Sequence, residues 1–187
     1  MDNKLKTSNL FFKGLIKQVS LSYVIALAVP ILYIYLMQFV DHTALWTSYF
    51  VVFIALIKSC YFTFFTFKQV TKSIEKCHSF KQLLWIFGLL VFLIIFSYSA
   101  DFTCLFVADS NSFNLGSTNI ATPYLNQLFD FFYFSVVTFA SIGYGDIVPV
   151  SLSAKLIVML EIGQSFVLIV FGLSNINRIP MLKNNKI

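Results

Sequence analysis

The sequence predicts an all-α membrane protein with four transmembrane helices and a re-entrant helix and loop between the third and the fourth. Of the 187 residues, 58% are hydrophobic and only 11% are charged, whereas a soluble domain carries about a quarter charged residues. Four apolar segments are each long enough to cross a bilayer, which takes about 20 residues in a helix. A further segment, between the last two, is aromatic but is interrupted by polar residues and glycines.

The four spans are predicted from apolar runs that contain few charges. They cover about residues 21–40, 46–67, 82–107 and 152–175. Lys58 lies inside the second span and Glu161 inside the fourth, where a charge is costly unless it is paired or faces water. Two arrangements are open. Lys58 and Glu161 form an ion pair, or, as we favour, Glu161 bonds to the back of the re-entrant helix while Lys58 extends towards the cytoplasm.

The segment from about Pro123 to Val148 is too polar and too rich in glycine to cross the membrane. Non-helical backbone at membrane depth is tolerated only where it is buried in protein or lines a water-filled cavity. We therefore expect a re-entrant helix at about Leu128–Ala140, followed by a loop at Ser141–Asp146 with the sequence SIGYGD. If all carbonyls of this loop point to one side, alternate residues need positive φ, which Gly143 and Gly145 tolerate.

Residues Phe131–Asp146 and Pro149 resemble the tetrameric potassium-channel family, whose usual filter reads Thr-Val-Gly-Tyr-Gly-Asp. The resemblance extends over about Lys81–Arg178 and includes the aromatic helix, the aspartate after the second glycine and a span on each side. It implies backbone carbonyls that replace the water shell of a dehydrated ion, and a homotetramer, since one copy cannot enclose a pore. Potassium is then a permeant ligand and no cofactor is needed. The expected potassium-binding residues are Ser141, Ile142, Gly143, Tyr144 and Gly145.

Three departures from the family pattern bear on the stability of the predicted filter. Ser141 keeps a hydroxyl but lacks the methyl group of the usual threonine. Phe134 replaces a tryptophan that bonds the filter tyrosine in many members, and Val137 replaces an acid that pairs with the filter aspartate in some. We therefore expect Tyr144 and Asp146 to lack these partners, with potassium selectivity kept. The residues expected to support the filter are Asp146, Phe134, Val137 and Thr138.

The fourth span is expected to act as the inner helix of the pore. In the register of the family, the candidate hinge positions are Ser165 and, close to it, Gly163 and Gly172. The residues that would face the inner cavity are Phe166, Ile169 and Leu173. An apolar constriction there gates a pore by dewetting, but ordinary packing between helices explains these three side chains equally well.

Basic residues predict the orientation of the chain, because cytoplasmic loops carry an excess of Lys and Arg. They gather in the N-terminal tail, between the second and third spans, and after Arg178, whereas the other side is mainly acidic. Both termini are therefore expected in the cytoplasm of a cell whose plasma membrane holds the protein. Between Thr66 and Lys81, lysines recur every four residues. We prefer a solvated loop here to a helix along the membrane surface.

The chain is expected to divide into three parts. Residues 1–80 hold a basic cytoplasmic tail, two spans and a basic linker, residues 81–178 form the pore domain, and residues 179–187 form a short cytoplasmic tail. The leading function is a potassium-selective channel. The alternatives are a nonselective cation channel and a non-conducting partner subunit of another channel. An enzyme is not expected, since no nucleophile–base set, phosphate loop or metal-ligand spacing is present, and the basic residues flank spans rather than suggest nucleic acid.

Overall fold

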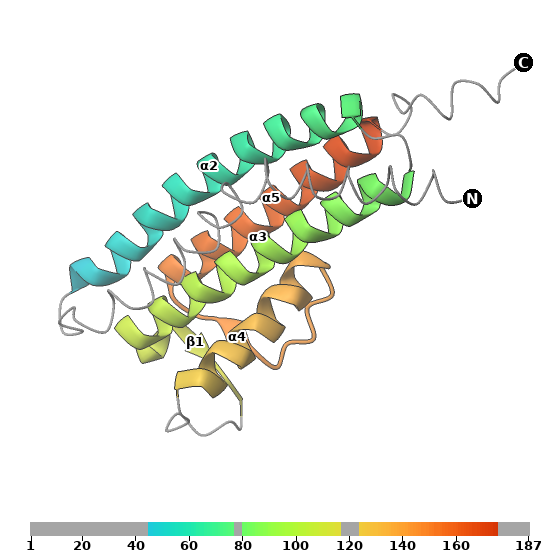
Figure 1. Cartoon of the computed structure of the whole chain (residues 1–187). Coiled ribbons are helices and arrows are strands. Elements are labelled where there is room, and N and C mark those ends of the chain that lie inside the picture. Colours follow the sequence, from blue (N-terminus) through green and yellow to red (C-terminus); the bar gives the residue numbers. More distant parts are fainter. Residues whose placement is uncertain (1–44, 77–79, 117–123, 176–187) are drawn as a thin grey trace, which may run out of the picture.

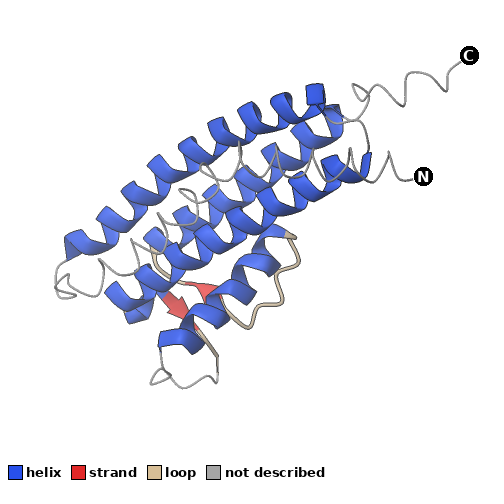
Figure 2. Ribbon diagram, in the orientation of Figure 1, coloured by secondary structure: helices blue, strands red, loops and turns tan. Residues whose placement is uncertain are grey.

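The computed structural model describes residues 45–76, 80–116 and 124–175. The elements follow in the order α2 (Leu45–Lys76), α3 (Phe80–Ala108), the 3-10 turn η1 (Ser110–Ser112), β1 (Phe113–Asn114), α4 (Tyr124–Phe139), β2 (Val148–Pro149) and α5 (Leu152–Asn175). The helices α2, α3 and α5 run side by side, and α4 packs against α3 and α5 (Figure 1). The two short strands lie beside α4 at one end of this bundle (Figure 2).

Three of these helices are long and apolar enough to cross a membrane. Their apolar windows are Thr47–Lys68, Leu84–Ala108 and Leu152–Gly172. They agree with the second, third and fourth predicted spans, while the first, residues 21–40, lies outside the described residues. The helix α4 has 16 residues and is therefore about 24 Å long at 1.5 Å per residue. This is less than the hydrocarbon core of about 30 Å, so α4 is too short to span.

The segment after the second span is helical, so the preference for a solvated loop was wrong for residues 66–76. The helix α2 continues without a break to Lys76. No glycine or proline interrupts it, and its last turns contain Lys, Gln and Glu, which are good helix formers. Extending an existing helix costs much less than nucleating a new one. The apolar span therefore serves as the nucleus that its polar continuation extends.

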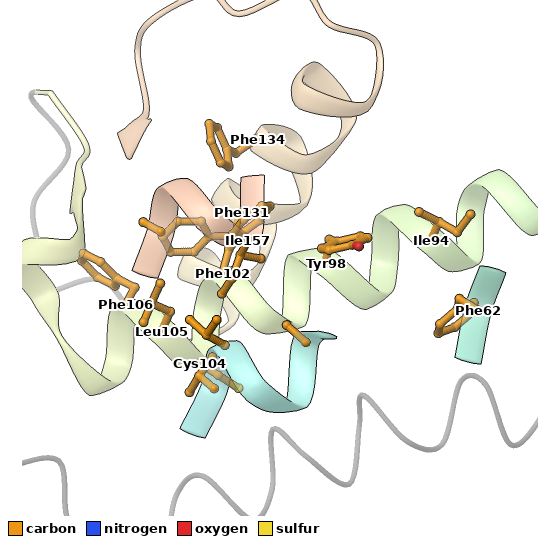
Figure 3. Close-up of a cluster of buried hydrophobic side chains, with 14 of the residues drawn as sticks. Phe62, Ile94, Tyr98, Phe102, Cys104, Leu105, Phe106, Phe131, Phe134 and Ile157 are labelled. Carbon is orange, nitrogen blue, oxygen red and sulfur yellow. The ribbon is translucent and has the colours of Figure 1, made fainter. Parts of the chain in front are cut away.

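The core is built around α3, which contacts α2, α4 and α5. Phe102 of α3 lies 5.1 Å from Phe134 of α4 and 5.7 Å from Phe113 of β1, measured between ring centroids. Figure 3 labels Phe102, Phe131 and Phe134 among the buried side chains of the core. Aromatic pairs of this geometry add about 0.5–1.5 kcal/mol beyond the burial of their area. This aromatic cluster joins α3, β1 and α4, and comprises Phe102, Phe106, Phe113, Phe131 and Phe134.

A buried ion pair ties α2 to α3. The Nζ atom of Lys58 lies 2.6 Å from Oδ2 of Asp101 and donates a hydrogen bond of 2.8 Å to the carbonyl of Ser97. Both charged side chains are buried. Lys58 therefore does not extend towards the cytoplasm, and its partner is not Glu161. The expectation for Lys58 was wrong because Asp101, on the neighbouring helix, supplies within the bundle the opposite charge that a cation at membrane depth needs.

Removing one partner of this pair leaves the other charge buried without compensation. We predict that Lys58→Met lowers the unfolding temperature, since breaking a buried pair on one side costs about 3–5 kcal/mol. Adding Asp101→Leu should restore most of the stability, because an apolar replacement of both partners is nearly neutral. Thermal unfolding in detergent, followed by circular dichroism, measures both variants.

The matched control is Lys68→Met, which changes an exposed lysine of the same helix and should leave the unfolding temperature unchanged. A double variant no more stable than Lys58→Met alone would contradict the assigned pairing.

Candidate functional site

The candidate filter segment, Ser141–Asp146, begins where α4 ends. The Ser141 N–H donates to the carbonyl of Thr138 and the Ile142 N–H donates to the carbonyl of Val137, both at 2.9 Å. The side chains of Val137 and Thr138 are buried. These two residues therefore support the segment with their backbone oxygens, and they fix the point at which helical backbone gives way to extended backbone.

Every second residue of this segment has positive φ. The angle is 55° at Ser141, 62° at Gly143 and 82° at Gly145. This is the alternation that a row of carbonyls on one side requires, and the sequence predicted it for the two glycines. It did not predict Ser141, where a residue with a Cβ atom pays about 1–2 kcal/mol in the left-handed region. Nothing lies within 4 Å of a Cβ added at Gly143 or Gly145, so the backbone conformation, and not space, demands glycine.

Tyr133 of α4 contacts the second half of the segment. Its ring stacks on that of Tyr144, with centroids 6.5 Å apart and ring planes 3° apart. Its hydroxyl donates to Asp146, and this hydrogen bond raises the pKa of Tyr133. Asp146 also accepts from the Ile147 N–H at 3.0 Å. Tyr144 and Asp146 thus share Tyr133 as a partner. The positions expected to lack a hydrogen-bonding partner for them, Phe134 and Val137, are apolar.

Phe134, which was expected to support the filter, lies in the aromatic cluster between Phe102 and Phe113. Its support is therefore indirect, because it holds α4 against α3 and β1. The residue that meets Tyr144 is the preceding one, Tyr133, which the sequence analysis did not single out. The feature of the sequence that could have identified Tyr133 is its hydroxyl group within a run of phenylalanines.

A two-stranded antiparallel sheet holds the far end of the segment. The opposed residues are Phe113 with Pro149 and Asn114 with Val148. The ladder continues as the Val150 N–H donates to the carbonyl of Ser112 at 2.9 Å. Because hydrogen-bonded and non-bonded pairs alternate, Pro149 lies at a non-bonded pair, where its missing N–H costs nothing. Phe113 belongs to the aromatic cluster, so the sheet attaches the end of the segment to the core.

Two of the residues expected to face an inner cavity lie on the uncovered side of α5. Phe166 is 68% exposed and Ile169 is 42% exposed. The side chain of Leu173 lies outside the described residues. The exposed fractions are compatible with a cavity enclosed by further copies of the chain.

The candidate hinge residues lie in an unbroken helix, since α5 is continuous from Leu152 to Asn175. Ser165 is buried and donates to the carbonyl of Ile162 at 2.8 Å, whereas Gly163 is exposed. A Cβ at Gly172 would lie 2.4 Å from Cε2 of Phe87. Gly172 therefore has a packing reason to be glycine, and a hinge at any of the three positions stays a prediction.

The side of α5 that faces the bundle forms hydrogen bonds with each of the other three α-helices in the described part of the chain. The Oε1 atom of Glu161 lies 2.5 Å from Oγ of Ser135 on α4, which confirms the favoured position of Glu161. Gln164, one turn further on, accepts hydrogen bonds from Ser59 of α2 at 3.0 Å and from Tyr98 of α3 at 2.9 Å.

These elements define a multi-pass membrane protein, with a short helix and an alternating segment inserted between two spanning helices. A family model described as an ion channel matches residues 88–181, about half of the chain. The chain therefore belongs to this ion channel family, and the match covers α4, the candidate filter segment and α5. No curated protein and no solved structure gave a match to the chain.

The hydrogen bond between Tyr133 and Asp146 predicts a pH dependence. It exists only while the phenol is protonated, so it stabilises the contact below the raised pKa of Tyr133 and is lost as the pH rises through that pKa. We predict that Asp146→Asn moves the ionisation of Tyr133 to lower pH. Ultraviolet titration of tyrosinate measures it, with Tyr133→Phe subtracted in each background to isolate this residue.

The matched control is Asp109→Asn. Asp109 caps the 3-10 turn η1 by accepting from the Asn111 N–H, so this change should leave the titration of Tyr133 where it is. If the Asp146 variant titrates at the same pH as the unmodified protein, Asp146 is not the acceptor.

Proposed function

We propose that the chain is one subunit of a homotetrameric, potassium-selective channel. The observation that carries the proposal is the alternation of positive and negative φ through a Gly-Tyr-Gly-Asp sequence. In such a segment the carbonyls of four successive residues replace the water shell of a dehydrated potassium ion. The ligands would be Ser141, Ile142, Gly143 and Tyr144, with Gly145 at the outer end and the Ser141 hydroxyl at the cavity end.

The exposed surfaces of a single chain support a tetramer. Ile142 and Tyr144 are 53% and 67% exposed, although they belong to the segment that must be held most rigidly. Large apolar side chains of α5, such as Phe166, are also exposed. Four copies around an axis would turn both surfaces towards the inside of the assembly, where the segment would line the pore and Phe166 would line the cavity. In this assembly α4 is the pore helix, and the negative end of its dipole favours a cation in the cavity.

We also propose that four helices per chain cross the plasma membrane, with both termini in the cytoplasm. The first span, residues 21–40, which are apolar and uncharged, would be added to the three that the structure describes. The distribution of charge supports the orientation. The segment that continues α2 past the membrane carries Lys68, Lys72 and Lys76, whereas Asp109 and Asp146 lie towards the opposite end. Positive charge marks the cytoplasmic side.

The nonselective alternative would follow if Ser141 and Phe134, in place of the usual threonine and tryptophan, loosened the filter. The contacts of Tyr133 with Tyr144 and Asp146 weaken that alternative, because a braced segment can keep its carbonyls at the spacing that suits one ion. A non-conducting partner subunit remains a separate class of function, and a recording of the purified chain distinguishes it.

Reconstituted protein should pass potassium far better than sodium. Under bi-ionic conditions, with potassium on one side of a planar bilayer and sodium on the other, the current should reverse at a potential that opposes potassium flow. A reversal near zero would favour the nonselective alternative. A chain that assembles but conducts no ion would favour the partner subunit.

A matched pair of glycine variants links this selectivity to the segment. Gly143→Ala should abolish the potassium current, because alanine disfavours the φ of 62° at this position. Gly88→Ala adds the same methyl group in α3, with nothing within 4 Å of the new Cβ atom, and should conduct as the unmodified chain does. Equal loss in both variants would point to general damage instead of a filter.

The proposed assembly predicts one mass. Native mass spectrometry of the protein released from lipid nanodiscs should give a complex of four chains. A tag on the C-terminus should be accessible only after the cell membrane is opened. A dimer as the largest species, or labelling of the tag on intact cells, would contradict the assembly or the orientation.

A further inference from the structure

Glu161 lies where α5 crosses α4 and α3. Its side chain is fully buried, and its Oε1 atom lies 2.5 Å from Oγ of Ser135. The same Oγ atom of Ser135 lies 2.9 Å from the carbonyl oxygen of Ile95 on α3. One serine hydroxyl on α4 therefore meets two oxygen atoms, one from each neighbouring helix.

The number of hydrogen atoms decides how these contacts are made. A serine hydroxyl carries one hydrogen, and a carbonyl oxygen can only accept. The contact between Ser135 and Ile95 therefore takes the serine hydrogen, since otherwise two oxygen atoms would meet lone pair to lone pair. The contact between Ser135 and Glu161 then needs a second hydrogen, and only the carboxyl group can supply it.

We propose that Glu161 is a neutral carboxylic acid whose proton is donated from Oε1 to the hydroxyl of Ser135. The chain of hydrogen bonds runs in one direction, from Glu161 on α5 through Ser135 on α4 to the carbonyl of Ile95 on α3. Glu161 thereby holds a proton within the membrane and acts as a positioning residue, because it reaches the candidate filter segment only through α4.

The charged and titratable groups around Glu161 agree with this assignment. From α2 comes Lys58, and from α3 come Asp101 and Tyr98. Ser135, the polar group that meets it from α4, does not titrate. Lys58 is already paired with Asp101 at 2.6 Å, and Tyr98 donates to Gln164. An ionised Glu161 would be a second buried anion facing one buried cation, a costly state at membrane depth.

The second carboxyl oxygen of Glu161, Oε2, also supports a neutral carboxylic acid. Within the described part of the chain, Oε2 of Glu161 has no hydrogen-bond partner. A buried carboxylate oxygen without a partner carries a large desolvation cost, while the carbonyl oxygen of a neutral acid carries a much smaller one. With the proton on Oε1, the single donor of the acid is used, and within the described residues only a neutral carbonyl oxygen stays without a partner.

Infrared difference spectroscopy of the purified chain in lipid tests the proposal directly. Subtracting the spectrum of Glu161→Gln from that of the unmodified protein at neutral pH should show the loss of the C=O stretch of a protonated carboxylic acid. Loss of carboxylate bands instead would overturn the proposal. This measurement does not require ion flow, so its result is independent of whether the protein conducts ions.

Two serine variants test where the proton goes. In Ser135→Ala the acid loses its acceptor, so its C=O stretch should move to higher frequency. Ser99→Ala is the matched control, because Ser99 is also buried and also bonds across to α4, at the carbonyl of Leu128, but should leave the band in place. An unmoved band in Ser135→Ala would overturn the donation to Ser135.

A stability measurement separates the donated hydrogen bond from mere space filling. Glu161→Gln keeps a donor at the same position and should unfold at the temperature of the unmodified protein, whereas Glu161→Met fills the space without a donor and should unfold at a lower one. If the glutamine variant is as unstable as the methionine variant, the donated bond is not what holds α5 to α4, and the proposal fails.

Discussion

A segment whose backbone alternates between positive and negative φ must be held at both ends, because no regular hydrogen-bond pattern of its own stabilises it. In this protein the near end is held by the last carbonyls of α4 and the far end by the sheet of β1 and β2. Tyr133 contacts the second half of the segment, at Tyr144 and Asp146. The rest of the fold follows from keeping these three supports rigid, since α4, β1 and α3 all meet in the aromatic cluster.

The bilayer imposes a second condition, because it offers no water to polar groups between the helices. The chain pairs polar groups between helices in two ways, one with charged and one with neutral side chains. Lys58 and Asp101 form an ion pair between α2 and α3. Gln164 of α5 accepts hydrogen bonds from the neutral side chains of Ser59 and Tyr98. Such hydrogen bonds favour one rotation of each helix about its own axis. Dispersion contacts between similar apolar faces specify this rotation poorly.

The sequence predicted what depends on local chemistry and missed what depends on the rotation of one helix against another. The start of α5 follows from Ser151, whose hydroxyl caps the helix by accepting from the Ala154 N–H. The positive φ of Gly143 and Gly145 follows from residue type. The pairing of Lys58 with Asp101 could not be predicted, because it requires the relative rotation of α2 and α3. Nor could the positive φ of Ser141, which is strain imposed by its neighbours and not a preference of serine.

The helix α2 lies before the region that the family model matches, yet it is part of the same packed unit. It meets α5 at two levels, through the hydrogen bond from Ser59 to Gln164 and through Phe67, whose ring centroid lies 4.3 Å from that of Phe171. A tilt of α5 away from α3 would therefore have to carry α2 with it or break contacts at both levels. Because packed helices exchange between discrete arrangements instead of deforming continuously, α2 restricts which positions α5 can adopt. The conformational freedom of α5 therefore depends on α2, whose residues lie before the region that the family model matches.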